Sequence, residues 1–326
     1  MHKLAIIIPT RNRPTLLAQT LRSLQAQTRR PDQVIVVDGS DEPVEGAVGR
    51  FELPLRFVRV MPPSLTRQRN AGRQAAAPDA TLVGYLDDDI VLEPDALAVM
   101  VRFWDRAGPE VGGASFHITN APYQRPGVLY RLFLIGSLRR GIILKSGFAT
   151  AVETKDEINR SEWLCGGATI WRREVVDRLT YDEWFGGAAN YEDADFSYRA
   201  GREWQLVVLR DAKIGHYPPP FDPKKMRLYG EMHVTYRWYF VKKHFRRTFP
   251  AFYWSTAGLI GSSFASALLG WSRPAFYSGC GAVVGLAKVL AGRAGAIHKE
   301  FRKEEKHSAA YGGGDKGGPP KEGAGR

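Results

Sequence analysis

Short apolar runs alternate with helical patterns through the first 110 residues, and this alternation constrains the fold more than any other feature. The runs are rich in Ile, Val and Leu, as expected of strands buried on both faces of a parallel sheet: Leu4–Pro9, Gln33–Val37, Leu55–Val60 and Thr81–Leu86. Helices are predicted at Pro14–Gln27, Ser64–Ala77 and Pro94–Ala107. This pitch predicts right-handed βαβ units, and therefore an α/β fold with a mostly parallel, Rossmann-like sheet flanked by helices.

Polar clusters follow three of the predicted strands. They are Thr10–Arg13, Asp38–Asp41 and Asp87–Asp89. Ligands of open α/β sheets bind beyond the carboxyl ends of the strands, so we expect the three clusters to converge in one crevice.

The acidic triplet Asp87-Asp88-Asp89 indicates a cation. Three adjacent carboxylates repel one another and raise each other's pKa unless a cation is present. A hard divalent ion, Mg²⁺ or Mn²⁺, bound through one or two carboxylates and a substrate's phosphates removes that cost. The alternative is a solvated acidic turn that caps the next helix. The convergence of the strand ends favours the metal.

A second acidic pair, Glu192-Asp193, precedes a predicted helix at residues 193–200. An anion at a helix N-terminus is favourable, and local chemistry alone favours a helix cap, with Asp195 facing solvent. The same position also suits a general base. One carboxylate suffices when the leaving group is a diphosphate that needs a cation rather than a proton.

Six segments, in this order, resemble family 2 glycosyltransferases. They are Ile-Ile-Ile-Pro-Thr-Arg-Asn-Arg at 6–13, Val-Val-Asp-Gly-Ser-Asp at 36–41, Arg-Gln-Arg-Asn-Ala-Gly at 67–72, Tyr-Leu-Asp-Asp-Asp at 85–89, Cys-Gly-Gly-Ala-Thr-Ile-Trp-Arg-Arg-Glu at 165–174 and Tyr-Glu-Asp-Ala-Asp-Phe-Ser-Tyr-Arg at 191–199. The resemblance covers roughly residues 3–216. It implies a GT-A fold and inverting transfer from a nucleotide diphosphate sugar.

The resemblance implies a donor site made of residues from the first 110 positions. Asp38 would accept a hydrogen bond from the base, Asp87 would contact the ribose side, and Asp89 would bind the metal. Asp88 could replace either neighbour. Arg69 either shares with Arg67 and Asn70 the contact to the diphosphate or ribose, or is solvated. The remaining donor-binding candidates are Pro9, Thr10, Arg11, Arg13, Gly39, Arg67 and Asn70.

The resemblance also implies the catalytic and acceptor residues. Asp193 would be the base and Glu192 would orient the acceptor. Gly166 and Gly167 would let the backbone approach the donor sugar, unless they are ordinary turn glycines. Trp184 would be an acceptor-sugar platform, or core. His216 would complete the metal site, contact a phosphate, or lie satisfied at the surface.

The C-terminal part is apolar and basic. Pro250–Trp271 carries no charge and is long enough to cross a bilayer core, and Pro274–Ala287 follows it. Basic residues stand before the first run, as at a cytoplasmic flank: Lys242, Lys243, Arg246 and Arg247. A membrane hairpin fits, with an amphipathic pair on the surface or a homodimer face as alternatives. The segment 224–247 would then contact lipid headgroups, or equally the phosphates of a polyprenyl-linked acceptor. Val128–Leu144 is predicted to form a core helix or, as the alternative, an acceptor-side lip.

These features predict four regions. A GT-A catalytic domain spans 1–217, with its nucleotide half at about 1–110 and its acceptor half at about 111–217. A basic aromatic segment follows at 218–248, a membrane-associated helical hairpin at 249–298, and a disordered polar tail at 299–326. The first apolar run is too short for a secretory signal, and Cys165 and Cys280 lack metal spacing. We therefore expect the chain at the cytoplasmic face of the plasma membrane.

The net charge of +12 indicates an anionic partner. No nucleic-acid motif appears, so we expect a nucleotide sugar, a lipid surface and a glycan or polyprenyl-linked acceptor. The predicted function is sugar transfer to such an acceptor in cell-surface polysaccharide or glycolipid synthesis. A nucleotide-sugar nucleotidyltransferase is an alternative, although the first strand is followed by Pro9–Arg13 rather than a Gly-rich loop. A non-catalytic membrane adaptor is the other, and it would leave both acidic clusters unexplained.

Overall fold

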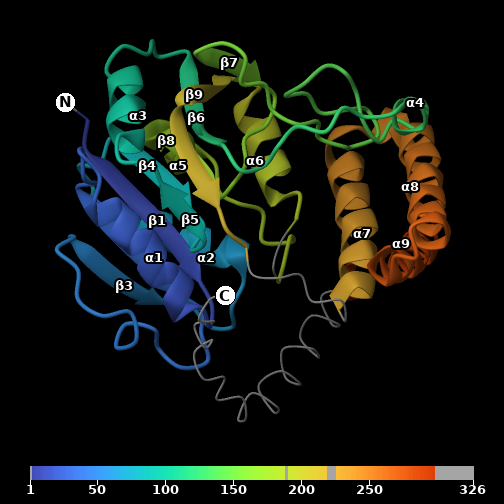
Figure 1. Ribbon diagram of the computed structural model, residues 1–326, viewed down its shortest axis with the longest axis horizontal. Coiled ribbons are helices and arrows are strands. Elements are labelled where there is room, and N and C mark those ends of the chain that lie inside the picture. Colours follow the sequence, from blue (N-terminus) through green and yellow to red (C-terminus); the bar gives the residue numbers. More distant parts are fainter. Residues whose placement is uncertain (1, 188–189, 219–224, 298–326) are drawn as a thin grey trace, which may run out of the picture.

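The chain folds around one mixed sheet, described here from a computed structural model that covers residues 2–187, 190–218 and 225–297. Within these residues the sheet has nine strands, with the order β3-β2-β1-β4-β8-β6-β9-β5 and β7 paired to β9. Helices cover both faces of the sheet, and three further helices form a bundle to one side (Figure 1).

The first four strands of the chain form the parallel half. They are β1 (Leu4–Thr10), β2 (Gln33–Asp38), β3 (Leu55–Arg59) and β4 (Leu82–Leu86), connected through α1 (Pro14–Gln25) and α2 (Leu65–Ala75). The register pairs Thr10 with Asp38 and Asp38 with Arg59. The polar ends of these strands therefore lie level with one another, as the alternating pattern predicts.

The second half of the sheet is mixed. It contains β5 (Ile90–Leu92), β6 (Val111–Ile118), β7 (Ile158–Ser161), β8 (Ala168–Arg172) and β9 (Gln205–His216), with α3 (Ala96–Trp104), α4 (Val128–Leu132), α5 (Arg173–Arg178) and α6 (Glu192–Ala200). β8 runs antiparallel between β4 and β6, and β5 and β7 run antiparallel to β9. β9 is the longest of the described strands, at 12 residues.

Two apolar clusters sandwich the sheet. Alternate residues of β1 point to opposite faces, so that Ile6 and Ile8 join one cluster with α1 and α3, and Ile7 joins the other. Both faces of the central strands are therefore covered, as their continuous apolar runs require.

The C-terminal helices are α7 (Met226–His244), α8 (Phe249–Leu269) and α9 (Arg273–Leu290), with short 3-10 turns at Arg246–Thr248 and Ala294–Ala296. α9 packs against both α7 and α8. A Cβ at Gly281 would lie 1.9 Å from the Arg227 carbonyl oxygen, and one at Gly285 would lie 2.9 Å from that of Glu231, so α9 packs closely on α7. About half of α7 is buried, while Lys225, Arg227, Lys242, Lys243 and Arg247 of segment 224–247 stay exposed. Residues 219–224 lie outside the described residues.

Across the described part of the chain, no helix combines the length and apolarity needed to cross a membrane. Pro250–Trp271 corresponds largely to α8, whose Ser, Gly and Ala residues dilute its hydropathy. Neither α8 nor α9 is therefore apolar enough over its length to count as a spanning helix.

An ion-pair network joins the bundle to the sheet domain. Asp195 on α6 is fully buried, and its carboxylate lies 2.7 Å from His244 Nε2 and 2.8 Å from Lys243 Nζ, both at the end of α7. Arg199 contributes a third ion pair at 2.9 Å. The alternative expectation that Asp195 faces solvent is wrong, because α7 packs over it.

Candidate active site

The acidic triplet lies in the short connection between β4 and β5, and β9 brings a histidine beside it. β5 pairs antiparallel with β9, with Ile90 opposite His216. Ligand atoms of Asp87, Asp89 and His216 consequently lie within 4.8 Å of one another, although His216 is 127 positions further along the chain than Asp89. Two carboxylates and an imidazole suit Mn²⁺, and carboxylates with phosphate oxygens suit Mg²⁺.

The polar atoms of Asp89 support a cation at this place. Its Oδ1 is buried and completes no hydrogen bond among the described residues, although His216 Nε2 lies 3.2 Å away. A buried carboxylate oxygen without a hydrogen bond is costly, and a metal ion would satisfy it. The Asp89 carboxylate also raises the pKa of His216. Binding a metal there would require the neutral imidazole.

Asp88 has a different environment from its two neighbours. Its carboxylate accepts a hydrogen bond of 2.6 Å from Thr10 Oγ1 and one of 3.2 Å from Arg13 Nη1, and Thr20 Oγ1 donates to its backbone carbonyl. Burial raises its pKa to about 6. Asp88 therefore ties the β4–β5 connection to the end of β1 and the start of α1, while Asp87 and Asp89 belong to the Asp-Asp-His cluster.

Asp38 holds the loop that follows β2 in place through hydrogen bonds. Its carboxylate accepts hydrogen bonds from the backbone N–H groups of Ser40 and Val44 and from Arg59 Nη1, at 2.8, 3.0 and 2.9 Å. Burial by itself raises its pKa, but these donors hold that pKa below its ordinary value. At Gly39, a Cβ would lie 2.9 Å from Pro63 Cβ, so this position requires glycine.

Arg69 connects the two acidic groups. Its guanidinium is buried, with Nη2 at 3.1 Å from Asp87 Oδ1 and Nη1 at 2.9 Å from Glu192 Oε1. The ring of Tyr181 lies 5.1 Å from its Cζ. One buried cation is therefore shared between the triplet and the Glu192-Asp193 pair, which the sequence left as separate features.

Glu192 and Asp193 begin α6, and the Gly166-Gly167 turn brings them next to the triplet. A Cβ at Gly167 would lie 1.9 Å from Asp87 Oδ2, and one at Gly166 would lie 2.9 Å from Asp193 Cβ. The glycines thus make room for the carboxylates. Burial raises the pKa of both Glu192 and Asp193, and Arg69 opposes that shift.

Other predicted site residues surround this centre. Pro9 lies within β1, and Arg11 lies 3.8 Å from Asp41. Asn70 exchanges hydrogen bonds with the backbone of Tyr181. Arg67 lies near Glu183, and Trp184 stacks on Tyr239 of α7, with 3.7 Å between ring centroids. Arg67 and Asn70 therefore contact the 181–183 segment, and Trp184 packs against the bundle.

Two residues of α2 matter more than the sequence reading indicated. Gln68 donates to the carbonyl oxygens of Thr10 and Val37, and so holds the ends of β1 and β2 together. For Arg69, the sequence alone does not decide between a contact with the diphosphate and a solvated position. Gly72 offers a signal that Arg69 turns inward. Its lack of a side chain lets α2 approach Ile7, which marks the buried face of the helix, and Arg69 lies three residues earlier on that face.

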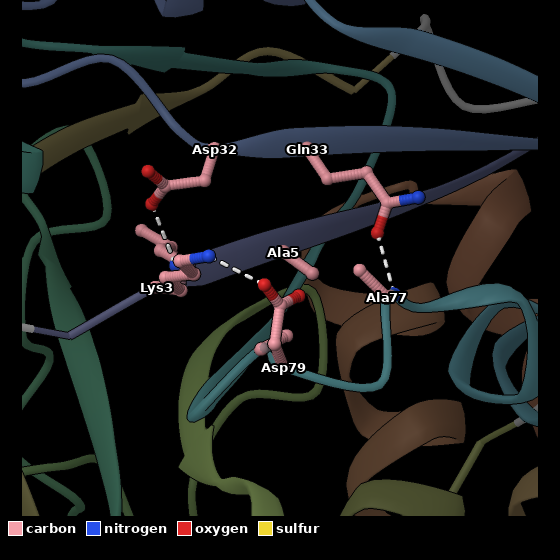
Figure 2. Close-up of a pocket in the computed structure, with 8 residues that line it drawn as sticks. Lys3, Ala5, Asp32, Gln33, Ala77 and Asp79 are labelled. Atoms are coloured by element: carbon pink, nitrogen blue, oxygen red, sulfur yellow. Dashed lines mark hydrogen bonds and ion pairs between the residues drawn. The ribbon is translucent and has the colours of Figure 1, made fainter.

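A pocket of about 300 Å³ lies at the opposite, amino-terminal end of the sheet. Figure 2 shows its polar side chains paired with neighbours: Lys3 with Asp79, Asp32 with the backbone of Leu4, and Gln33 with that of Ala77. The acidic and cationic groups described above all lie at the carboxyl end, where ligands of such sheets bind.

Residues 5–153 match the family described as Glycosyl transferase family 2. The chain is 25% identical over 218 residues to the uncharacterized glycosyltransferase YwdF of Bacillus subtilis (strain 168), which covers 65% of this chain and 73% of that protein. It is 35% identical over 98 residues to the validoxylamine A glucosyltransferase of Streptomyces hygroscopicus subsp. limoneus, which covers 28% of this chain and 21% of that protein.

Two solved structures share the fold. The mannosyltransferase PcManGT from Pyrobaculum calidifontis, in complex with GDP-Man and Mn²⁺, aligns with a TM-score of 0.53 and 19% identity over 94% of this chain and 84% of that one. GalNAc-T7 with UDP, GalNAc and Mn²⁺ aligns with a TM-score of 0.54 and 17% identity over 71% and 47%. The predicted α/β fold of the GT-A type is confirmed, and the nucleotidyltransferase and adaptor alternatives have no support from these matches. The chain therefore resembles family 2 glycosyltransferases, with its family match at residues 5–153, and its relatives named as glycosyltransferases support a transferase.

Proposed function

We propose that this glycosyltransferase transfers a sugar, with inversion, from a nucleotide diphosphate sugar to a hydroxyl of a glycan or polyprenyl-linked acceptor. We place the reaction at the cytoplasmic face of the plasma membrane, in the synthesis of a cell-surface polysaccharide or glycolipid. The observation that carries the proposal is the cluster of Asp87, Asp89 and His216 beside Asp193, with Arg69 between the two acidic groups.

The donor side of this site suits a diphosphate. Asp87, Asp89 and His216 would hold Mg²⁺ or Mn²⁺, which would neutralise the charge on the departing nucleoside diphosphate. Arg13, 3.7 Å from Asp89 and half-exposed, adds a cation at the same edge. The structures that share the fold hold GDP-Man or UDP together with Mn²⁺, which supports a donor of this class.

The acceptor side requires one base. Asp193 would accept the proton of the acceptor hydroxyl at its Oδ2, which now lies 3.4 Å from the Gly166 N–H. Its burial raises its pKa above the ordinary value, which makes the carboxylate a stronger base. Glu192, fixed by Arg69, would hold the start of α6 in place.

A donor screen with two variants tests the proposal. Release of nucleoside diphosphate from a panel of nucleotide sugars is measured with membrane-lipid extracts as acceptor, with Mn²⁺ or Mg²⁺ and with chelator. Asp89→Asn should lose metal-dependent donor binding, whereas Asp193→Asn should bind donor normally and lose transfer. Asp105→Asn, on an exposed aspartate after α3, is the matched control.

Three outcomes would contradict this assignment. Transfer at an unchanged rate by Asp193→Asn would remove it from the role of base. Full activity in chelator would remove the metal. Equal donor binding by Asp89→Asn and Asp105→Asn would place the diphosphate elsewhere.

A further inference from the structure

Large apolar side chains are exposed mainly on two segments of the fold, residues 121–152 and residues 245–297. On the first, α4 presents Val128 and Leu129 with 70% and 67% of their surface exposed. On the second, Leu269 at the end of α8 and Trp271 in the turn before α9 have 87% and 91% of their surface exposed. Outside residues 121–152 and 245–297, the large apolar side chains with comparable exposure in the described chain are Met61, Ile158 and Tyr217.

The two segments are joined in space. Trp254 of α8 donates a hydrogen bond of 2.8 Å from Nε1 to the Leu132 carbonyl oxygen, and its ring stacks on Phe133 at 4.7 Å. A Cβ at Gly258 would lie 2.4 Å from Phe133, so α8 is shaped to receive this segment. Figure 1 shows α4 lying against the upper part of α8. Residues 121–152 therefore pack against the first half of α8, whereas Leu269 and Trp271 lie at and beyond its far end. We call residues 121–152 and 245–297 together the composite surface.

This composite surface carries cations and no anions. Neither segment contains Asp or Glu. Their exposed basic residues are Arg125, Arg131, Arg139, Lys145, Arg247, Arg273 and Arg293. Over 85 residues of a chain in which Asp and Glu number 34, the absence of acids concentrates positive charge around the apolar side chains.

We infer that the composite surface docks on an anionic phospholipid bilayer without crossing it. Apolar side chains that project from helix ends enter the headgroup region, while arginines around them pair with lipid phosphates. No described helix meets the requirements for spanning. Both acid-free segments contribute to this surface, so α4 joins the end of segment 224–247 in facing the lipid.

A homodimer explains the surface less well. A two-fold interface places the same patch against itself, and a patch with arginines and no carboxylates would then face its own positive charge. An anionic bilayer satisfies the apolar groups and the charge at once. This inference rests on the proposed function in one respect, because a lipid-linked acceptor gives the docking its purpose.

Vesicle sedimentation with the full chain tests the inference. Vesicles of phosphatidylglycerol and phosphatidylcholine are compared with phosphatidylcholine alone. The variants are Leu129→Ser/Leu132→Ser on α4 and Leu268→Ser/Leu269→Ser/Trp271→Ser at the end of α8 and in the turn that follows it. Ile158→Ser, on the exposed face of β7 and 49% exposed in the wild type, is the matched control.

We expect binding to the anionic vesicles that falls with added salt, and at least a tenfold loss in each multiple variant. Arg131→Gln should weaken binding about fivefold, from the typical contribution of one basic residue near an anionic surface. The control should bind as the wild type does. Because the altered side chains are exposed, thermal unfolding midpoints should be unchanged.

Several results would overturn the inference. They are binding to neutral vesicles as strong as to anionic ones, an equal loss in Ile158→Ser, and a concentration-dependent dimer that the serine variants abolish without affecting vesicle binding. Nucleoside diphosphate release with a soluble acceptor separates this inference from the proposed function. Vesicle binding lost by the serine variants supports the docking surface even if no donor turns over.

Discussion

Arg69 lies in an environment unlike that of an ordinary surface arginine. Its guanidinium has almost no contact with solvent and lies between two carboxylates that belong to different parts of the site. Burying a cation this deeply is favourable only when its partners are ionised and well placed. Arg69 thereby couples the charge state of the acidic pair on α6 to that of the triplet.

Replacing Arg69 should destabilise the protein strongly. In Arg69→Ala, Asp87 and Glu192 lose their shared cation, and a broken buried ion pair typically costs about 3 kcal/mol or more. Urea unfolding followed by circular dichroism measures the change. Arg67→Ala, two residues earlier with only a 3.9 Å contact to Glu183, should change stability by about 0.5 kcal/mol or less. Similar losses in both variants would contradict the role of Arg69.

Gly167 allows a second test at the same scale. In Gly167→Ala the new Cβ would occupy the position of the Asp87 carboxylate, only 1.9 Å away, so Asp87 must move out of the Asp-Asp-His cluster. We expect at least a tenfold loss of Mn²⁺-dependent nucleoside diphosphate affinity in calorimetry. Gly46→Ala is the control, because a Cβ there has nothing within 4 Å. Unchanged affinity in Gly167→Ala would show that Asp87 does not take part.

At the level of elements, the network around Asp195 connects α6 with α7. Burial by itself raises the pKa of Asp195, but His244, Arg199 and Lys243 hold that pKa below its ordinary value of 3.8. The ionised carboxylate therefore contributes stability that is present above pH 3.8. This contribution is lost as the pH falls through the lower pKa of the folded state.

Asp195→Asn should lower the free energy of unfolding by roughly 2 kcal/mol at neutral pH, because it leaves charged partners unpaired. Below about pH 4 the difference from the wild type should shrink, since the wild type then loses the same contribution. Denaturant titrations between pH 3 and 7 measure both effects. Asp211→Asn removes an exposed carboxylate whose pKa Arg210 also lowers, and its unfolding curve should barely change. A pH-independent difference for Asp195→Asn would refute this account.

The sequence predicted the elements whose residues follow one repeating pattern. The parallel half was predictable because both faces of β1, β2 and β4 are buried, which leaves continuous apolar runs. β6 was missed because Gly112 and Gly113 interrupt its pattern. Both are glycine because the rings of Trp204 and Trp171 lie where their Cβ atoms would be. Such a requirement comes from residues distant in the chain.

The full length of β9 could not be predicted from the sequence for a similar reason. Arg210, Asp211 and Lys213 break its apolar run, and the register with β6 shifts there between Phe116 and His117. The polar residues therefore sit at a bulge rather than at the end of a strand. The location of the three strand-end clusters followed from topology. Which arginine of α2 turns inward depended on packing against β1, and sequence spacing alone left it open.

At the scale of the whole molecule, the candidate site joins parts of the fold that are far apart in the chain. α2, the β4–β5 connection, the Gly166-Gly167 turn, α6 and β9 all reach it. A ligand held by all of them stabilises the folded state against unfolding of any one.

We therefore expect Mn²⁺ and a nucleoside diphosphate together to raise the thermal unfolding midpoint. At a ligand concentration of 100 times Kd, the expected stabilisation is about 2.7 kcal/mol. Differential scanning fluorimetry with UDP, GDP and ADP measures it. Chelator or Asp89→Asn should abolish the shift, and Asp105→Asn should keep it. A full shift without metal would contradict joint binding.

The ladder between β5 and β9 has a consequence for where the enzyme begins and ends. The family match stops at residue 153, before the helix that presents Asp193 and before the strand that presents His216. A protein truncated at residue 153 would keep Asp87 and Asp89 but lose His216 and the proposed base, Asp193. If Asp193 and His216 act as proposed, the smallest active unit is larger than the stretch that the family model matches, and it extends at least to the end of the pairing between β5 and β9.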